Sequence, residues 1–188
     1  MTRGFMVAAA ALMLVLASGV RADALDGRLE VSAAHVVLAN SVYALHARIE
    51  YPMTPAIVNA LHDGVTLTFE LEARITRDRH FWIDPVIANV KLRRVLAYHS
   101  ISGRYVVRDV HRHDLQSFSS LDDALAFLSK VDGWPILVAS QLRPGERYHI
   151  SLRAGIRRGR LPASLRALLF WTSDWHRVSK WYTWKLPS

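Results

Sequence analysis

The chain contains no cysteine among its 188 residues. Disulfide bonds, thiolate metal sites and cysteine nucleophiles are therefore excluded, and no lipid can be attached to an N-terminal cysteine. A chain of this length can nevertheless bury a hydrophobic core that is large enough to fold without covalent cross-links.

Several motifs that identify common enzyme classes are also absent. The sequence has no G-x-S-x-G nucleophile elbow, no phosphate-binding glycine loop and no dinucleotide-binding fingerprint. No internal repeat or low-complexity linker divides the chain. These absences predict one domain over residues 25–188, with no catalytic residues and no cofactor.

Long apolar runs are missing except near the N-terminus. Residues 5–17 are apolar and uncharged, follow Arg3, and precede small residues at Ala22 and Ala24. This order predicts a secretory signal peptide over residues 1–24, cleaved after Ala22 or Ala24. The run is shorter than the roughly 20 residues that span a bilayer. We therefore expect a protein that is periplasmic or secreted.

Acidic residues are outnumbered: Asp and Glu total 16 against 24 Lys and Arg, giving a formal net charge of +8. Most of the basic residues are arginines, which suit bidentate pairing with carboxylate or phosphate. In an exported protein this charge points to anionic lipid headgroups, lipopolysaccharide, cell-wall glycan or an acidic protein surface, and makes nucleic acid an unfavoured partner. Solubility alone is the simpler explanation.

Alternating hydrophobicity predicts antiparallel β-strands in much of the chain. The clearest alternation covers residues 65–75 and 148–156. Further strands are predicted at 28–38, 43–51, 90–101 and 104–110. Turn-forming residues at Asn40 and Ser41, and at Ser102 and Gly103, predict two hairpins.

Helix signals interrupt these strands at three places. Thr54 and Pro55 begin one predicted helix, Ser120 caps a second, and Pro162 begins a third that extends to about Trp171. We therefore predict a mainly β fold, an antiparallel β-sandwich-like domain with two or three short helices. An open sheet covered by helices is the alternative.

Two pairs of residues have spacings that could carry chemistry. His111 and His113 would share one face of a strand and could reach one metal ion, with Asp114 nearby. No third ligand is indicated, so a solvated strand end is the favoured interpretation. Glu70 and Glu72 also share a strand face, which would suit paired-carboxylate catalysis. The favoured interpretation is a solvated sheet face whose acids pair with arginines across the strands.

Two surfaces are candidates for binding. Arg157, Arg158 and Arg160 precede the third predicted helix, whose N-terminus would favour an anion; a solvated connecting loop is the alternative. Aromatic residues crowd the C-terminus, where Trp175, Trp181 and Trp184 could contact sugar rings or a membrane interface. They could equally fill the core, and on a strand Trp181 and Trp184 would point to opposite faces.

Several segments, taken in order, resemble one protein family. They are ALHDGVTL (60–67), RHFWID (79–84), YHSISGRY (98–105), SFSSLDDAL (117–125) and residues 175–184. The chain resembles exported proteobacterial proteins described as domain of unknown function 4390. The resemblance implies no activity, ligand or catalytic residue. Family members often lie beside genes for a membrane sensor kinase and its response regulator, which implies a sensor-associated periplasmic module.

These observations lead to three expectations of function. The first is a non-enzymatic envelope protein that binds or modulates a membrane-associated partner, with a sensor kinase as one candidate. The second is a protein that binds an anionic envelope component. The third is a hydrolase or metal-dependent enzyme that would use His111, His113 and nearby acids.

Overall fold

The computed structural model describes residues 28–79, 84–159 and 176–187. The predicted signal peptide, the helix predicted from Pro162, Arg160 and Trp175 lie outside these described residues. Within the described ranges, no helix is long and apolar enough to cross a membrane.

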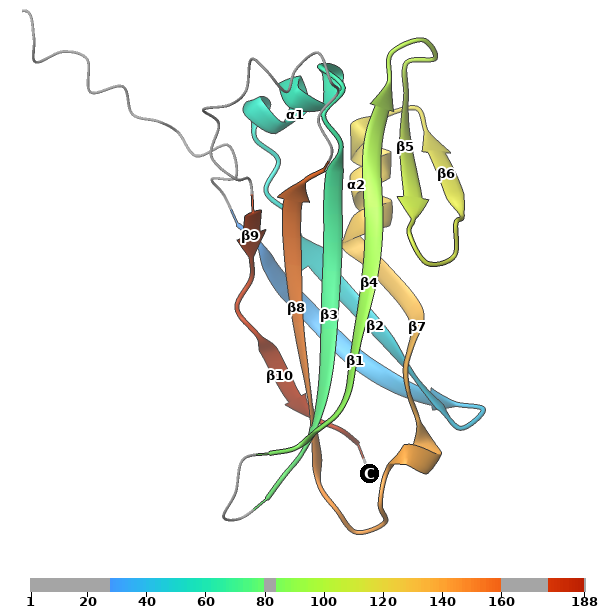
Figure 1. Ribbon diagram of the computed structural model, residues 1–188, viewed down its shortest axis with the longest axis vertical. Coiled ribbons are helices and arrows are strands. Elements are labelled where there is room, and N and C mark those ends of the chain that lie inside the picture. The colour runs from blue at the N-terminus through green and yellow to red at the C-terminus, as the bar shows by residue number, and fades with distance from the viewer. Residues whose placement is uncertain (1–27, 80–83, 160–175, 188) are drawn as a thin grey trace, which may run out of the picture.

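The described residues form a mainly β fold, as predicted, with two short α-helices between the strands (Figure 1). The elements, in chain order, are β1 (Glu30–Ala39), β2 (Val42–Glu50), α1 (Pro55–His62), β3 (Leu67–Arg77), β4 (Val86–His99), β5 (Arg104–Asp109), β6 (Leu115–Phe118), α2 (Leu121–Ser129), β7 (Lys130–Val138), the short 3-10 helix η1 (Ala139–Gln141), β8 (Tyr148–Arg158), β9 (His176–Val178) and β10 (Tyr182–Lys185).

The described strands form two antiparallel sheets. The small sheet has three strands in the order β1-β2-β7. The large sheet has seven strands in the order β10-β8-β3-β4-β5-β6, with β9 paired to β8 beside β10. In Figure 1 the small sheet lies behind the large one and its strands cross those of the large sheet obliquely. The predicted antiparallel, sandwich-like architecture is therefore confirmed.

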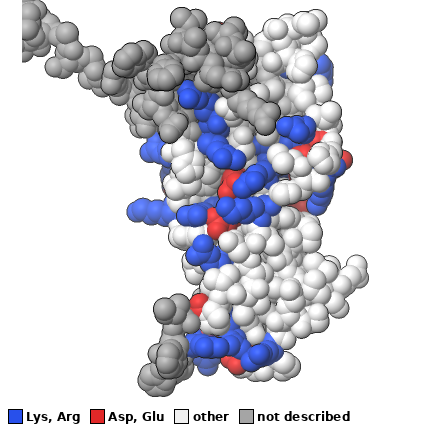
Figure 2. Space-filling view, in the orientation of Figure 1, with Lys and Arg blue, Asp and Glu red and all other residues white. Residues whose placement is uncertain are grey.

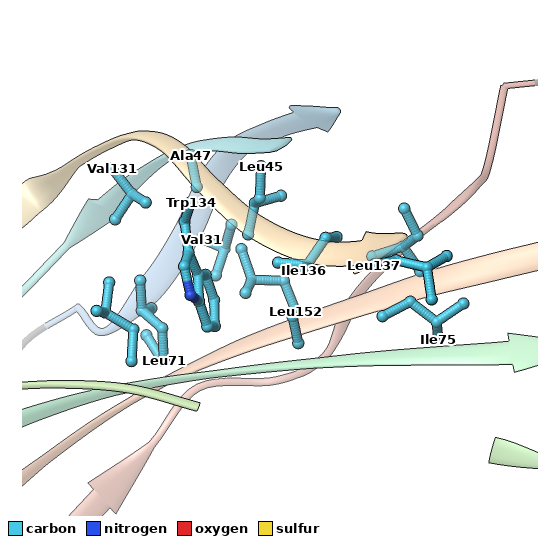
Figure 3. Packing of buried hydrophobic residues seen from close by; sticks show 14 of the residues in the cluster. Val31, Leu45, Ala47, Leu71, Ile75, Val131, Trp134, Ile136, Leu137 and Leu152 are labelled. Carbon is cyan, nitrogen blue, oxygen red and sulfur yellow. The ribbon is translucent and has the colours of Figure 1, made fainter. Parts of the chain in front are cut away.

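Side chains from both sheets meet in one hydrophobic core (Figure 3). Leu45 and Trp134 come from the small sheet, and Leu71, Ile75 and Leu152 from the large sheet. Leu45, Ile75 and Leu152 are fully buried. Because alternate residues of each strand face this core, the opposite face of the large sheet is left to polar side chains.

The two helices cover the remainder of the same face of the large sheet. Ile57 of α1 and Leu128 of α2 are buried in a second cluster against that face. Both helices begin where predicted: the Thr54 hydroxyl accepts a hydrogen bond from the Ile57 N–H at 3.4 Å, and the Ser120 hydroxyl accepts one from the Asp123 N–H at 3.1 Å. A small sheet and two helices thus share one covering layer, which combines the two predicted architectures.

The hairpin turns also lie where the sequence predicts them. Asn40 and Ser41, between β1 and β2, have φ angles of 49° and 63°. Two successive positive φ angles are typical of the type I′ turn, which matches the twist of a two-strand hairpin. Gly103, between β4 and β5, has a φ angle of 63°, a conformation that glycine adopts without steric cost.

Replacing Leu152 with alanine tests the packing between the two sheets. Leu152 is fully buried in the first core, so Leu152→Ala should lower the free energy of unfolding by about 2–5 kcal/mol. Urea unfolding followed by tryptophan fluorescence measures this change. Leu115→Ala is the control, because Leu115 is 64% exposed on β6 and its loss should cost less than about 0.5 kcal/mol. Equal losses for the two variants would contradict the described core.

Candidate functional site

The face of the large sheet that points away from the core is rich in charge. Alternate residues of β3 point into the core, so Glu70, Glu72 and Arg74 project from the opposite face. Figure 2 shows Lys and Arg side chains gathered on this face around a few acidic ones. We call the surface formed by Arg74, Lys91, Arg93, Arg153 and Arg157 the basic face.

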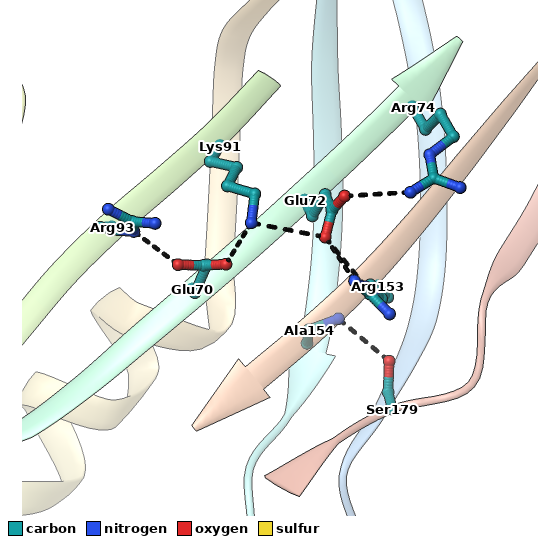
Figure 4. A network of polar contacts seen from close by, with 8 residues as sticks. All are labelled: Glu70, Glu72, Arg74, Lys91, Arg93, Arg153, Ala154 and Ser179. Atoms are coloured by element: carbon teal, nitrogen blue, oxygen red, sulfur yellow. Dashed lines mark hydrogen bonds and ion pairs between the residues drawn. The ribbon is translucent and has the colours of Figure 1, made fainter. Parts of the chain in front are cut away.

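Both acids on this face are held by basic residues from neighbouring strands (Figure 4). Glu70 binds Arg93 and, at 3.0 Å, the Lys91 ammonium. Glu72 accepts hydrogen bonds from Arg153 Nη2 at 2.7 Å and Nε at 3.0 Å, and its other oxygen lies 3.4 Å from Arg74 Nη2. The predicted pairing of this sheet face with arginines is confirmed.

These contacts shift the pKa values of both carboxyl groups downward. Burial alone would raise the pKa of Glu72, but the hydrogen bond and charge of Arg153 outweigh burial and hold this pKa below its ordinary 4.5. The same balance lowers the pKa of Glu70, where burial is outweighed by hydrogen bonds from Arg93 and Lys91. Both groups are therefore anionic at neutral pH and already neutralised by their neighbours.

An aromatic ring packs against the guanidinium groups that bind Glu72. The Trp181 ring lies 4.8 Å from Arg74 Cζ and 4.5 Å from Arg153 Cζ, measured to the ring centroid. These distances allow cation–π attraction to both arginines. The Glu72 side chain is only 5% exposed, so the ring and the two arginines together exclude water from it.

A pocket of about 290 Å³ opens in the basic face beside this network. Gly155 lies in its lining and pairs with Glu70 of β3 on one side and Val178 of β9 on the other. Because Gly155 has no side chain, Val178 packs close to β8 here: its Cγ1 would lie only 3.4 Å from a Cβ at this position. The pocket is also lined by Glu72, Lys91, Arg153, Arg157 and His176. We call it the Gly155 pocket.

The segment between β9 and β10 is fixed to β8 behind this pocket. The Ser179 hydroxyl accepts a hydrogen bond from the Ala154 N–H at 3.0 Å, and the Ser179 N–H donates to the Ala154 carbonyl at 2.8 Å. Ser179 is buried, so these bonds are shielded from water. They keep the β9 wall of the Gly155 pocket at a fixed distance from its β3 wall.

The charges around the pocket do not cancel. Glu70 and Glu72 are outnumbered by the five bases of the basic face. Arg157 is exposed and has no acidic partner among the described residues. The pocket therefore presents an excess of positive charge, with guanidinium groups suited to carboxylate or phosphate. Anion binding is the chemistry that this arrangement favours.

The arginine run that was a candidate for anion binding belongs partly to a strand. Arg157 and Arg158 are the last two residues of β8, so the alternative interpretation of the run as a connecting loop is wrong at these two positions. Arg157 faces the Gly155 pocket, whereas its neighbour Arg158 is the register partner of buried Leu67 and points to the other side. Because successive residues of a strand point to opposite faces of the sheet, Arg157 and Arg158 do not lie at the same site.

The predicted histidine pair does not lie on a strand. Strand β5 ends at Asp109, and His111 and His113 occupy the turn that follows, where His113 has a φ angle of 59°. The Asp109 carboxylate accepts hydrogen bonds from the N–H groups of His111 and Arg112 at 2.9 and 3.0 Å, which fixes this turn. The strand placement was wrong, and the described residues contain no group of three or more ligands that could hold a metal ion.

The two described C-terminal tryptophans face opposite sides of the large sheet. Trp181 packs on the basic face, whereas Trp184 is the register partner of buried Ile150 and packs against the first core. The indole N–H of Trp184 is buried without a hydrogen-bond partner within the described residues. Of these two described tryptophans, Trp181 therefore belongs to the candidate site and Trp184 does not.

Sequence reasoning missed several residues of this site. Gly155 carried a usable signal, because a glycine inside an alternating strand often marks a close approach or an open space. Lys91 and Arg93 could be assigned only once the register of β4 against β3 was known. His176 and Val178 had no signal, since β9 is three residues long.

Comparison with known proteins identifies the family. A family model described as Domain of unknown function (DUF4390) matches residues 26–185, so the chain belongs to this family. No curated protein and no solved structure matches the chain.

Neutralising Glu72 tests the charge network. Glu72→Gln should lower the free energy of unfolding at pH 7 by about 1–3 kcal/mol, because three basic side chains lose a shared acceptor. Arg74 and Arg153 are each about one third exposed, which keeps the loss below that of a fully buried pair. Urea unfolding measures the change.

The pH dependence provides the control for this variant. Since the folded pKa of Glu72 is depressed, its contribution is fully present above pH 4.5 and is lost as the pH falls through the folded pKa. The Glu72→Gln variant should therefore lose less stability between pH 5 and pH 3 than the parent protein. Glu50→Gln, at a carboxylate on β2 that is about half exposed, should follow the parent. Parallel curves for parent and Glu72→Gln would contradict the proposed role of Glu72.

Proposed function

We propose that this protein is an exported, non-enzymatic binding module whose basic face binds an anionic component of the cell envelope. The observation that carries the proposal is the Gly155 pocket, where Arg157 is exposed without an acidic partner among the described residues. Export rests on the N-terminal sequence, which has the order of a signal peptide.

The state of the two carboxylates supports a binding function over an enzymatic one. A general base must be able to accept a proton near the working pH. Glu70 and Glu72 have lowered pKa values and are each bound by at least two basic groups. Neither carboxylate is free to take a proton from a substrate.

Phosphate groups of anionic lipids suit the basic face best. The face belongs to a sheet and carries long cationic side chains, so several of them can approach a planar surface together. Each Lys or Arg near an anionic membrane surface contributes about 1 kcal/mol of attraction. This attraction is screened by salt, which distinguishes it from burial of apolar surface.

Charge reversal at Arg157 tests this proposal. Arg157→Glu should weaken binding to phosphatidylglycerol vesicles on the order of tenfold, because it replaces an attractive charge with a repulsive one. Vesicle co-sedimentation at two salt concentrations measures the change. Arg48→Glu is the matched control: Arg48 is exposed on β2 of the other layer and undergoes the same change of charge. Equal losses of vesicle affinity in both variants would show that binding depends on net charge alone and not on the basic face. Absence of binding by the parent protein would refute the lipid proposal.

An apolar surface elsewhere favours a second candidate, a membrane-associated protein partner. Val37 and Leu38 of edge strand β1 are 46% and 54% exposed, and Val138 of β7 is 45% exposed at the same end of the small sheet. An edge strand with exposed apolar side chains offers both hydrogen bonds and hydrophobic contact to another chain. A protein that modulates a partner would use such an edge.

Crosslinking in intact cells tests the second candidate. The tagged parent protein should recover one envelope protein, and Leu38→Glu should abolish that recovery because it places a charge in the apolar contact. Leu115→Glu is the control, since Leu115 is exposed on β6, the edge strand of the other sheet. Recovery that is unaffected by Leu38→Glu would exclude this edge as the contact.

A further inference from the structure

A second and larger pocket lies at the opposite end of the sandwich from α1. It has a volume of about 490 Å³ and is formed by the connection from η1 to β8 together with the residues after β10. In Figure 1 these segments lie together at the bottom of the molecule, whereas α1 lies at the top. None of its lining residues lines the Gly155 pocket.

The inner part of this pocket is apolar and continuous with the first core. Tyr43, Leu142 and Leu186 line it and pack against the core, and Tyr148 is itself buried. Tyr148 joins the two walls: its hydroxyl accepts a hydrogen bond from the Arg143 N–H at 2.8 Å, and its carbonyl accepts one from the Leu186 N–H at 2.9 Å. These two hydrogen bonds fix the two walls of the pocket relative to each other.

The rim of the pocket is cationic. Arg143, Arg147 and Lys185 are exposed lining residues, and none has an acidic partner among the described residues. The one acid in the lining, Glu146, lies 3.8 Å from Arg77 Nη1. Three cations therefore surround an apolar interior, and the one carboxylate is already paired.

Arg77 adds a buried charge behind this rim. It is the register partner of Tyr148, its side chain is 10% exposed, and its Nε has no hydrogen-bond partner in the described part of the chain. A buried guanidinium normally has its donors satisfied. Within the described residues its one ion pair is the long contact to Glu146, so the described part of this end of the sandwich has more positive charge than its acids satisfy.

We propose that this pocket binds a single-chain amphiphile with an acidic head group, such as a fatty acid. The apolar interior formed by Leu142, Tyr148 and Leu186 would take the chain. Arg143 and Arg147 would pair with the head group, because guanidinium binds carboxylate and phosphate through two parallel hydrogen bonds. The inference does not depend on the lipid surface proposed for the basic face, since the two sites share no residue.

The test compares ligands with one chain and different head groups. Dodecanoate, dodecyl maltoside and dodecyltrimethylammonium are titrated below their micelle concentrations and followed by calorimetry and by ¹H–¹⁵N spectra. Dodecanoate should bind, shift the amide signals of Arg143 and Leu186, and bind at least tenfold more tightly than the other two. Dodecyl phosphate, run in parallel, distinguishes a carboxylate ligand from a phosphate-bearing one.

Variants then separate the head-group contact from net charge. Arg143→Glu with Arg147→Glu should weaken dodecanoate binding at least tenfold, and Leu186→Asp should abolish it. Arg48→Glu with Arg108→Glu is the control, because both residues are exposed on other strands and the change of charge is identical. Absence of binding, equal affinity for the three head groups, or equal effects of the two double variants would overturn the proposal.

Discussion

The antiparallel pairing of β3 with β8 runs without a register shift from Leu67 opposite Arg158 to Arg77 opposite Tyr148. Along this pairing, one face carries buried residues such as Leu71 and Leu152, and the other carries the charged residues of the basic face. A slip of one residue would exchange the two faces, placing carboxylates in the core and leucines in water. The core, the charge network and the Gly155 pocket therefore all depend on one register.

The charge network makes this register more specific than the core alone would. Glu72 is almost buried on a sheet face, a position that is stable only when basic groups satisfy its oxygens. Lys91 of β4 and Arg153 of β8 are its register partners on the two sides. Any other alignment of these strands would leave a buried carboxylate without its bases. The network consequently selects one arrangement, even though the basic partners are about one third exposed, which reduces the free energy that each pair contributes by itself.

Much of the fold could be predicted because its main elements have strong local signals. Strands β3 and β8 alternate strictly, and the caps at Thr54 and Ser120 mark helices that the structure contains. Strand β7 was missed because it starts at Lys130, directly after α2, with no turn residue between them. Strands β9 and β10 are too short for a periodic pattern to emerge.

The site was harder to predict because its residues are brought together by pairing between strands. The run after Ile156 resembled a basic loop, but the Gly159 N–H still donates to the Thr66 carbonyl at 2.7 Å, so the backbone follows β3 to that point. A side chain at Gly159 would place its Cβ only 2.1 Å from Thr66 Oγ1, which explains the glycine. The predicted placement of His111 and His113 on a strand was wrong for a local reason, because the Asp109 side chain forms the turn that ends β5.

Gly155 differs from Gly159 in a way that bears on function. A Cβ at Gly155 would meet its nearest neighbour, Val178 Cγ1, at 3.4 Å, an ordinary contact, and the backbone there does not require glycine. Glycine in a strand interior costs roughly 0.5–1 kcal/mol relative to alanine. Alanine would therefore fit at this position, whereas a longer side chain would meet Val178 or the backbone carbonyls of Arg177 and Glu70, which lie 3.4–3.9 Å from that Cβ. The missing side chain lets β9 pack close to β8 at this point, and the Gly155 pocket, lined also by Arg153 and Arg157, opens beside this contact. The shape of the proposed anion site therefore depends on the same close packing of β9 against β8 that Gly155 permits.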